Sequence, residues 1–186
     1  MKHYPEAYVR YLIEFHATRD YFECHELLEE HWKEEGPAAP LARTWVALIQ
    51  LAVGQYHHRR GNASGALKML RQALRGFDQE ALAGLGLDGG RLQEMVRGRA
   101  RELEGGGRSC PFRDLNLPLA DPDLVARCLA RGDEIRASWG LPSRIDDVAL
   151  VHRHTLRDRT DVIAAREAAL ARRRSGQDDR PGAIRN

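Results

Sequence analysis

The stretch from Asp20 to Trp32 brings together side chains that can bind a metal ion or move protons. It reads Asp-Tyr-Phe-Glu-Cys-His-Glu-Leu-Leu-Glu-Glu-His-Trp. On a helix that turns 100° per residue, His25 and Glu29 share a face, and Glu26 and Glu29 can converge on one point beside it. Imidazole and carboxylate groups at the rim of a core are costly to desolvate unless they are paired or bind a metal. The spacing therefore predicts a polar site on this helix.

The next helix along the chain offers further candidates for the same site. Gln50 and His57 are seven residues apart and interrupt an otherwise apolar surface. If the two helices form an antiparallel hairpin that turns near Pro37, Gln50 lies roughly level with His25. His57 then lies farther along, because a helix rises about 1.5 Å per residue. A contact from Gln50 is thus easier to form than a chelate of His25 with His57.

The first interpretation of this site is a metal centre. His25, Glu29 and His57 would bind a divalent metal ion, and Glu26 would act as a general base toward a metal-bound water. The run His-Glu-Leu-Leu-Glu is similar to the His-Glu-x-x-His motif of zinc proteases. Glutamate replaces the second histidine, which removes the strongest ligand of that motif. The cofactor under this interpretation is a divalent metal ion of unknown identity.

Two other interpretations need no metal. The cluster can form an acid–base or small-ligand pocket in which Gln50 and Trp32 contact the ligand. It can also be a buried polar network whose hydrogen bonds are satisfied within the protein and which sets the register of the two helices. The sequence leaves all three interpretations open, and it does not decide whether the protein is an enzyme.

The elements that must position these residues are helices. Apolar residues recur mostly at helical spacing and alternating stretches are nearly absent, so we predict an all-α fold. Asp20 is a good N-cap, with Glu23 at the spacing of a capping box, and Gly36 with Pro37 ends the helix. Helices are expected at about residues 5–17, 21–35, 41–60, 63–77, 88–104, 121–139, 145–152 and 157–174.

The predicted architecture is an antiparallel bundle of four to five helices with a helical C-terminal arm, because the first four helices have short connections. Residues 1–80 would form a four-helix core that carries the His-Glu-x-x-Glu motif. Residues 81–110 would add a weaker helix and a glycine-rich connector. Residues 111–174 would form the arm packed on the core, and residues 175–186 a disordered tail.

Composition restricts the class of protein. The chain has 186 residues, of which 42% are hydrophobic and 30% charged, a balance typical of a soluble globular domain. No uninterrupted apolar run approaches the roughly 20 residues of a membrane span, and the N-terminus has no signal-peptide core. Three widely spaced cysteines are typical of a reducing compartment. We therefore expect a cytoplasmic protein with no membrane partner.

Charge is unevenly distributed along the chain. Residues 1–58 carry nine acidic and five basic side chains, a net charge of −4, which leaves +6 for residues 59–186. The most basic segment is the expected last helix, which could dock on the bundle, pair with another subunit in a homo-oligomer, or contact nucleic acid. Acids interleaved through this half favour a solvated surface over a nucleic-acid site. A non-catalytic interaction or scaffold protein that uses this arm is the alternative function. Its candidate contact residues are Arg166, Arg172, Arg173 and Arg174.

Taken together, these motifs resemble the domain-of-unknown-function family 309 (DUF309) over about residues 15–77. The resemblance implies an all-helical bundle and no established activity. It also implies that His25, Glu26, Glu29, Gln50 and His57 act as one unit. This sequence departs from the family pattern at Cys24 and His31, outside that unit. The matching residues are Tyr21-Phe22, His25-Glu26, Glu29, Trp32, Leu48-Ile49-Gln50-Leu51-Ala52, His57 or His58, Gly61-Asn62 and Gly65-Ala66.

Overall fold

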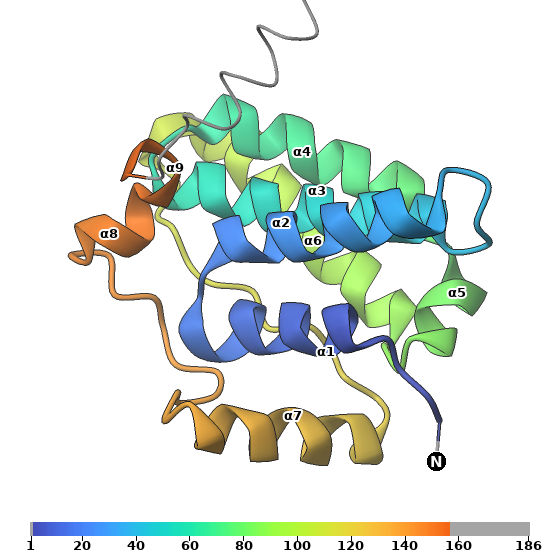
Figure 1. The fold of residues 1–186 in the computed structure, drawn as a ribbon. Coiled ribbons are helices and arrows are strands. Elements are labelled where there is room, and N and C mark those ends of the chain that lie inside the picture. Colours follow the sequence, from blue (N-terminus) through green and yellow to red (C-terminus); the bar gives the residue numbers. More distant parts are fainter. Residues whose placement is uncertain (1, 157–186) are drawn as a thin grey trace, which may run out of the picture. The chain divides into compact units, whose positions relative to one another are not determined.

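The structure, a computed structural model, describes residues 2–156, and every regular element in this range is helical (Figure 1). The predicted all-α class is confirmed. Within the described helices, none combines the length and hydropathy needed to cross a bilayer. The helices are α1 (Glu6–Ile13), α2 (Tyr21–Glu35), α3 (Ala42–Arg59), α4 (Ala63–Gly76), α5 (Gln79–Gly84), α6 (Gly89–Gly106), α7 (Pro122–Glu134), α8 (Val148–Val151) and α9 (Arg153–Leu156), with a π turn η1 (Glu14–Thr18) and a 3-10 turn η2 (Gly107–Ser109).

Side-chain caps fix where the site-bearing helices begin. The Asp20 carboxylate accepts a hydrogen bond from the backbone N–H of Glu23 at 3.0 Å, which confirms the predicted N-cap of α2. Asn62 caps α4 in the same way through Gly65 at 2.9 Å. Such caps contribute about 1 kcal/mol each because they satisfy a backbone donor that the helix itself leaves unpaired. α2 ends at Glu35, and its C-cap Gly36 has a φ of 83°, a conformation that favours glycine.

Helix α3 is the central helix and lies between α2 and α4 (Figure 1). Its Trp45, Leu48 and Leu51 are fully buried. α4 approaches α3 closely at Gly54, where an added Cβ would lie 2.8 Å from a methyl carbon of Leu70. α1 packs against α2 and α7, while α4 packs against α6. α2, the helix with the His-Glu-x-x-Glu motif, therefore packs against a buried central helix.

The core extends well beyond the first 80 residues. Helix α6 is 18 residues long and buries Leu92, Val96 and Leu103 in the same hydrophobic cluster as the first four helices. Residue Leu124 of α7 belongs to that cluster too. The weaker helix expected within residues 81–110 is thus a full packing partner, and the boundary predicted at residue 80 does not limit the core.

Several predicted boundaries shift. The short helix α5 is not in the predicted set, and the helix expected to reach Trp139 ends at Glu134. Just beyond that end, Arg136 takes a left-handed conformation with φ of 54°, which a continuing helix cannot accommodate. The helix expected at residues 157–174, its arginines and the predicted tail lie outside the described residues. The arm-based alternative function therefore stays a prediction.

A buried arginine network ties the loops after α6 and α7 to the first three helices. Arg59, at the end of α3, is 8% exposed, and its guanidinium stacks over the Tyr21 ring with 4.9 Å between guanidinium carbon and ring centre. Burial lowers the pKa of Arg59 from its usual range, and the neighbouring tyrosine and carboxylates oppose that shift. Arg59 donates hydrogen bonds to the carbonyl of Arg19 at 2.6 Å, to Ser143 Oγ at 3.2 Å and to the carbonyl of Leu150 at 3.2 Å.

Asp114 and Arg19 complete this network, which we call the Arg59 network. Asp114 accepts hydrogen bonds from the Tyr21 hydroxyl at 2.6 Å and from the backbone N–H of Ser143 at 2.6 Å. Arg19 is 2% exposed and has a left-handed backbone conformation. Its guanidinium donates hydrogen bonds to carbonyl groups of residues before and after it in the chain. Its partners are Phe15, Leu115, Asn116 and Leu141.

His16 lies next to this network in an apolar environment. It is 1% exposed, stacks flat on Trp139 with 4.5 Å between ring centres, and has no hydrogen-bond partner for either ring nitrogen within the described residues. Burial, together with the nearby Arg19, lowers the pKa of His16 from 6.5 to about 3. His16 is therefore neutral in the folded protein under ordinary conditions.

Acidification should destabilise the protein through His16. Between pH 6.5 and 3 the unfolded chain binds a proton at this residue and the folded protein does not, so stability is lost as the pH falls through this window. We expect a loss of about 2 kcal/mol at pH 5 relative to pH 7.5. His16→Phe keeps a ring on Trp139 and should remove this part of the loss. Urea unfolding of both proteins at the two pH values checks it, and parallel losses would contradict it.

Candidate functional site

The buried residues of α2 determine which of its side chains are exposed to solvent. Tyr21, Cys24 and Leu28 are fully buried and follow helical spacing, so they fix the rotation of α2 about its axis. His25 and Glu29 then fall at the rim, where their side chains are 30% and 34% exposed. The predicted placement of these two residues on one face of α2 is confirmed.

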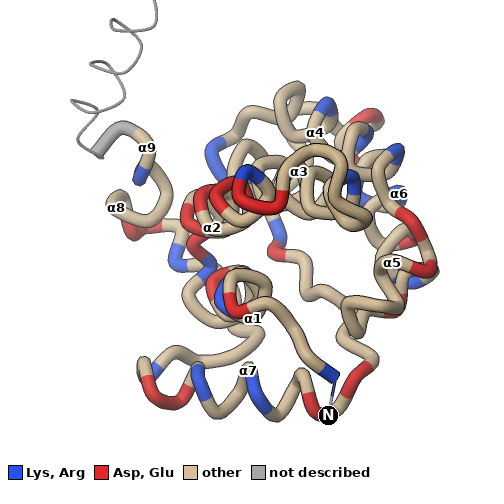
Figure 2. The backbone as a smooth tube through the Cα atoms, turned by 45° about the vertical axis from the view of Figure 1, so that its right-hand side comes forward, with Lys and Arg blue, Asp and Glu red and all other residues tan. Residues whose placement is uncertain are grey.

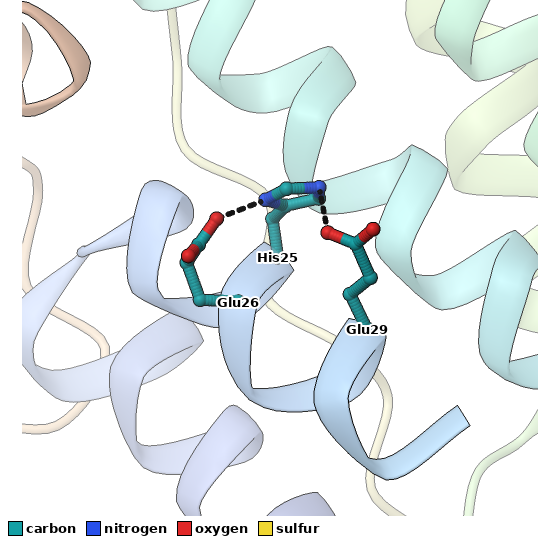
Figure 3. Close-up of side chains that lie close together, drawn as sticks. All are labelled: His25, Glu26 and Glu29. Atoms are coloured by element: carbon teal, nitrogen blue, oxygen red, sulfur yellow. Dashed lines mark ion pairs between the residues drawn. The ribbon is translucent and has the colours of Figure 1, made fainter. Parts of the chain in front are cut away.

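His25 lies between two carboxylates (Figure 3). Its Nδ1 is 3.0 Å from Glu26 Oε1, and its Nε2 is 3.0 Å from Glu29 Oε2. Glu29 also forms an ion pair with Lys33, with 2.9 Å between Oε1 and Nζ. Each member of the trio offers one ligand atom, and these three atoms lie within 4.8 Å of one another. We call His25, Glu26 and Glu29 the α2 cluster.

The electrostatics of the α2 cluster favour an ionised Glu29. The hydrogen bond from Lys33 is the main cause that lowers the pKa of Glu29; burial opposes this shift, and the nearby His25 adds a smaller lowering effect. Each ring nitrogen of His25 thus faces a carboxylate oxygen at 3.0 Å, while Lys33 engages the other oxygen of Glu29.

The register between α2 and α3 places Gln50 at about the height of the α2 cluster along the helix axes. Ring contacts between Phe22 and Tyr56 at 6.0 Å and between His31 and Trp45 at 5.3 Å define how the two helices run past each other. Counting inward from either pair puts Gln50 level with residues 26–28 of α2, close to the predicted height of His25. The two helices are thus aligned as the sequence predicts.

Gln50 and Trp32 line the same groove. The hollow has a volume of about 450 Å³ and lies between α2, α3 and α4. Trp32 enters it one helical turn beyond Glu29 on the same face of α2. The structure therefore brings together the two residues predicted to contact a ligand. The groove, which we call the Trp32 groove, is lined by Trp32, Pro37, Ala42, Arg43, Val46, Gln50, Gln72, Arg75 and Gly76.

His57 is separate from the α2 cluster. Its Nδ1 lies 3.2 Å from the side-chain nitrogen of Asn62, at the turn into α4. Burial, helped by Arg60, lowers the pKa of His57. His57 is not a member of the ligand group that the described residues form. The reason is its height on α3, two turns beyond Gln50.

Some polar residues of structural importance give no clear sequence signal. His58, next to His57, is buried at 3% exposure instead of lying on the surface, and its Nε2 is 3.2 Å from the carbonyl oxygen of Cys110. Arg59 is expected from the sequence only to complement the C-terminal dipole of α3. The groups that accept its hydrogen bonds lie at least 40 residues away along the chain, so no local pattern could reveal them.

Comparison with known proteins agrees with the resemblance that the motifs suggest. The family described as Domain of unknown function (DUF309) matches residues 8–69, a range that contains the α2 cluster, Trp32, Gln50 and His57. The uncharacterized protein YpuF of Bacillus subtilis (strain 168) is 44% identical over 177 residues, which cover 94% of this chain and 99% of the relative. The chain belongs to the DUF309 family. No solved structure matches it.

The α2 cluster should contribute little to stability, in contrast to the Arg59 network. Exposed ion pairs stabilise by about 0 to 1 kcal/mol, so His25→Gln should change the free energy of unfolding by less than about 1 kcal/mol. Arg59→Met leaves buried hydrogen-bond acceptors unpaired and should cost about 3 kcal/mol. Urea unfolding of both variants, with the exposed Arg91→Met as control, measures the difference. A larger cost for His25→Gln than for Arg59→Met would identify the cluster as a structural network.

Proposed function

We propose that the α2 cluster binds a divalent metal ion and that this DUF309 protein is a metal-dependent, hydrolase-like small-ligand protein. The observation that carries the proposal is the convergence of one imidazole and two carboxylates, with ligand atoms within 4.8 Å of one another. Nitrogen and oxygen ligand atoms lie about 2.0–2.2 Å from a zinc ion, so two ligand atoms of the same ion are at most about 4.3 Å apart. Small side-chain rotations therefore suffice to hold an ion.

The contacts of His25 suggest a role for each residue. Its Nε2 faces Glu29, and its Nδ1 faces Glu26. In this arrangement His25 and Glu29 hold the ion, while Glu26 holds the other ring nitrogen and orients the imidazole. Metal-binding histidines commonly donate their second ring N–H to a carboxylate in this way. Glu26 is then a positioning residue, and its predicted role as general base would require it to turn from His25 toward a bound water.

The donor set determines the kind of ion and the chemistry. One imidazole nitrogen with carboxylate oxygens suits zinc, manganese or iron better than calcium, which prefers oxygen ligands alone. Two protein ligands leave coordination positions for water or for a substrate. When bound, such an ion would polarise a substrate carbonyl or phosphoryl oxygen and acidify a bound water. The one-third exposure of the cluster leaves room for that ligand to approach.

Metal binding should depend on each member of the α2 cluster to a different degree. Calorimetric titration of untagged protein with ZnCl₂ or MnCl₂ should give one site per chain. His25→Ala and Glu29→Gln remove ligands and should weaken binding by about 100-fold, while Glu26→Gln should weaken it by about tenfold. Glu30→Gln, a neighbouring exposed acid, serves as control. The proposal is wrong if native protein shows no stoichiometric binding, or if Glu30→Gln matters as much as Glu29→Gln.

Lys33 should compete with the metal for Glu29. Its ion pair engages Glu29 Oε1 at 2.9 Å, and an exposed pair of this kind contributes up to about 1 kcal/mol. Lys33→Met should therefore strengthen metal binding by up to about fivefold, the equivalent of that free energy. Lys68→Met removes the same charge from α4 and controls for the general electrostatic effect. Equal strengthening in both variants would show that net charge, and not the Glu29 pair, is responsible.

A further inference from the structure

The Trp32 groove has positively charged residues and no carboxylate in its lining. Arg43 enters it from the start of α3 and Arg75 from the end of α4. Both side chains are exposed, and neither forms an ion pair within residues 2–156. Arg43 also donates a hydrogen bond to the backbone carbonyl of Arg75, which holds the first guanidinium at the groove. Two arginines that form no ion pair within the described part of the chain thus line one hollow.

The charges around the groove are segregated by helix (Figure 2). Acidic residues follow α2, whereas every charged residue of α4 is basic: Lys68, Arg71 and Arg75. Arg71 is paired with Glu104 of α6, which leaves Arg75 and Arg43 as the charges of the groove. A ligand in the groove would therefore meet the positive charge of Arg43 and Arg75.

The rest of the lining suits a flat organic group. Trp32 and Val46 offer partly exposed apolar surface, and Gln50 and Gln72 offer amide groups that can donate and accept hydrogen bonds. A volume of about 450 Å³ is within the range of small-molecule sites. Arginine recognises phosphate and carboxylate groups through paired N–H donors, and it does so best where no protein carboxylate competes.

We infer that the Trp32 groove binds a small organic anion, a phosphate monoester or carboxylate attached to a planar group. The anion contacts Arg43 and Arg75, and the planar group lies against Trp32. This part is independent of the proposed metal. Because Glu29 is three residues and His25 seven residues from Trp32, the α2 cluster spans about 5 to 10 Å from Trp32 along α2. An anion of that length would also reach the metal ion, and this second part rests on the proposed function.

Binding of 1-naphthyl phosphate to metal-free protein tests the groove. Calorimetry in EDTA should show one site, with 1-naphthol, which lacks the anion, binding at least about tenfold more weakly. The Arg43→Gln/Arg75→Gln double variant should lose about tenfold or more in affinity. Arg91→Gln/Arg101→Gln, which removes two exposed arginines from α6, is the matched control. Unchanged affinity in the first double variant, or equal binding of 1-naphthol, would overturn the inference.

A second experiment tests the groove and the metal site separately. Adding ZnCl₂ should strengthen binding of 1-naphthyl phosphate to native protein, and Glu29→Gln, which removes a metal ligand, should abolish this gain. If zinc gives no gain while the arginine effect persists, the metal-bridging part fails and the groove assignment stands. If the arginine effect is absent while zinc still binds, the groove assignment fails and the metal site stands. Thermal unfolding of each variant confirms that it is folded.

Discussion

The need to satisfy a buried guanidinium organises much of this fold. Arg59 ends the central helix inside the protein, where an unpaired charge would cost several kcal/mol. The carbonyl groups that accept its hydrogen bonds come from Arg19 and from Leu150, segments that are far apart in the chain. Asp114 then anchors Tyr21, on which Arg59 stacks. Loops with little regular structure are thereby held against α2 and α3.

That network also determines how the candidate site is presented. α2 begins at Tyr21, whose ring and hydroxyl are both held, and its preceding residue Asp20 caps the helix and pairs with Arg153. With its first turn held in this way, α2 has a defined rotation and height relative to α3. The α2 cluster then stays at the rim, outside the core. The buried face of α2 packs against the core, and the α2 cluster lies on the partly exposed face of the same helix.

The side chains of the α2 cluster are about one-third exposed, whereas Arg59 and Arg19 are buried. Arg59 and Arg19 of the Arg59 network are buried and donate mainly to backbone carbonyl groups, which is typical of a structural role. His25 and Glu29 contact only side chains of their own helix among the ion pairs described, and they remain about one-third exposed. Groups that keep access to solvent and are held by weak pairs can exchange those partners for a ligand. The Trp32 groove, in contrast, carries the positive charges of Arg43 and Arg75.

Local chemistry in the sequence determined the helices and the composition of the α2 cluster. The Asp20 cap, the stop at Gly36 and the spacing of His25, Glu26 and Glu29 act within a few residues, so they could be read correctly from the chain. Tertiary structure alone decided that His57 lies apart from the α2 cluster, that His58 and His16 are buried, and that Arg43 and Arg75 line one groove. These outcomes depend on helix heights and on loops that return from distant parts of the chain. Contacts between residues so far apart leave no periodicity in a single sequence.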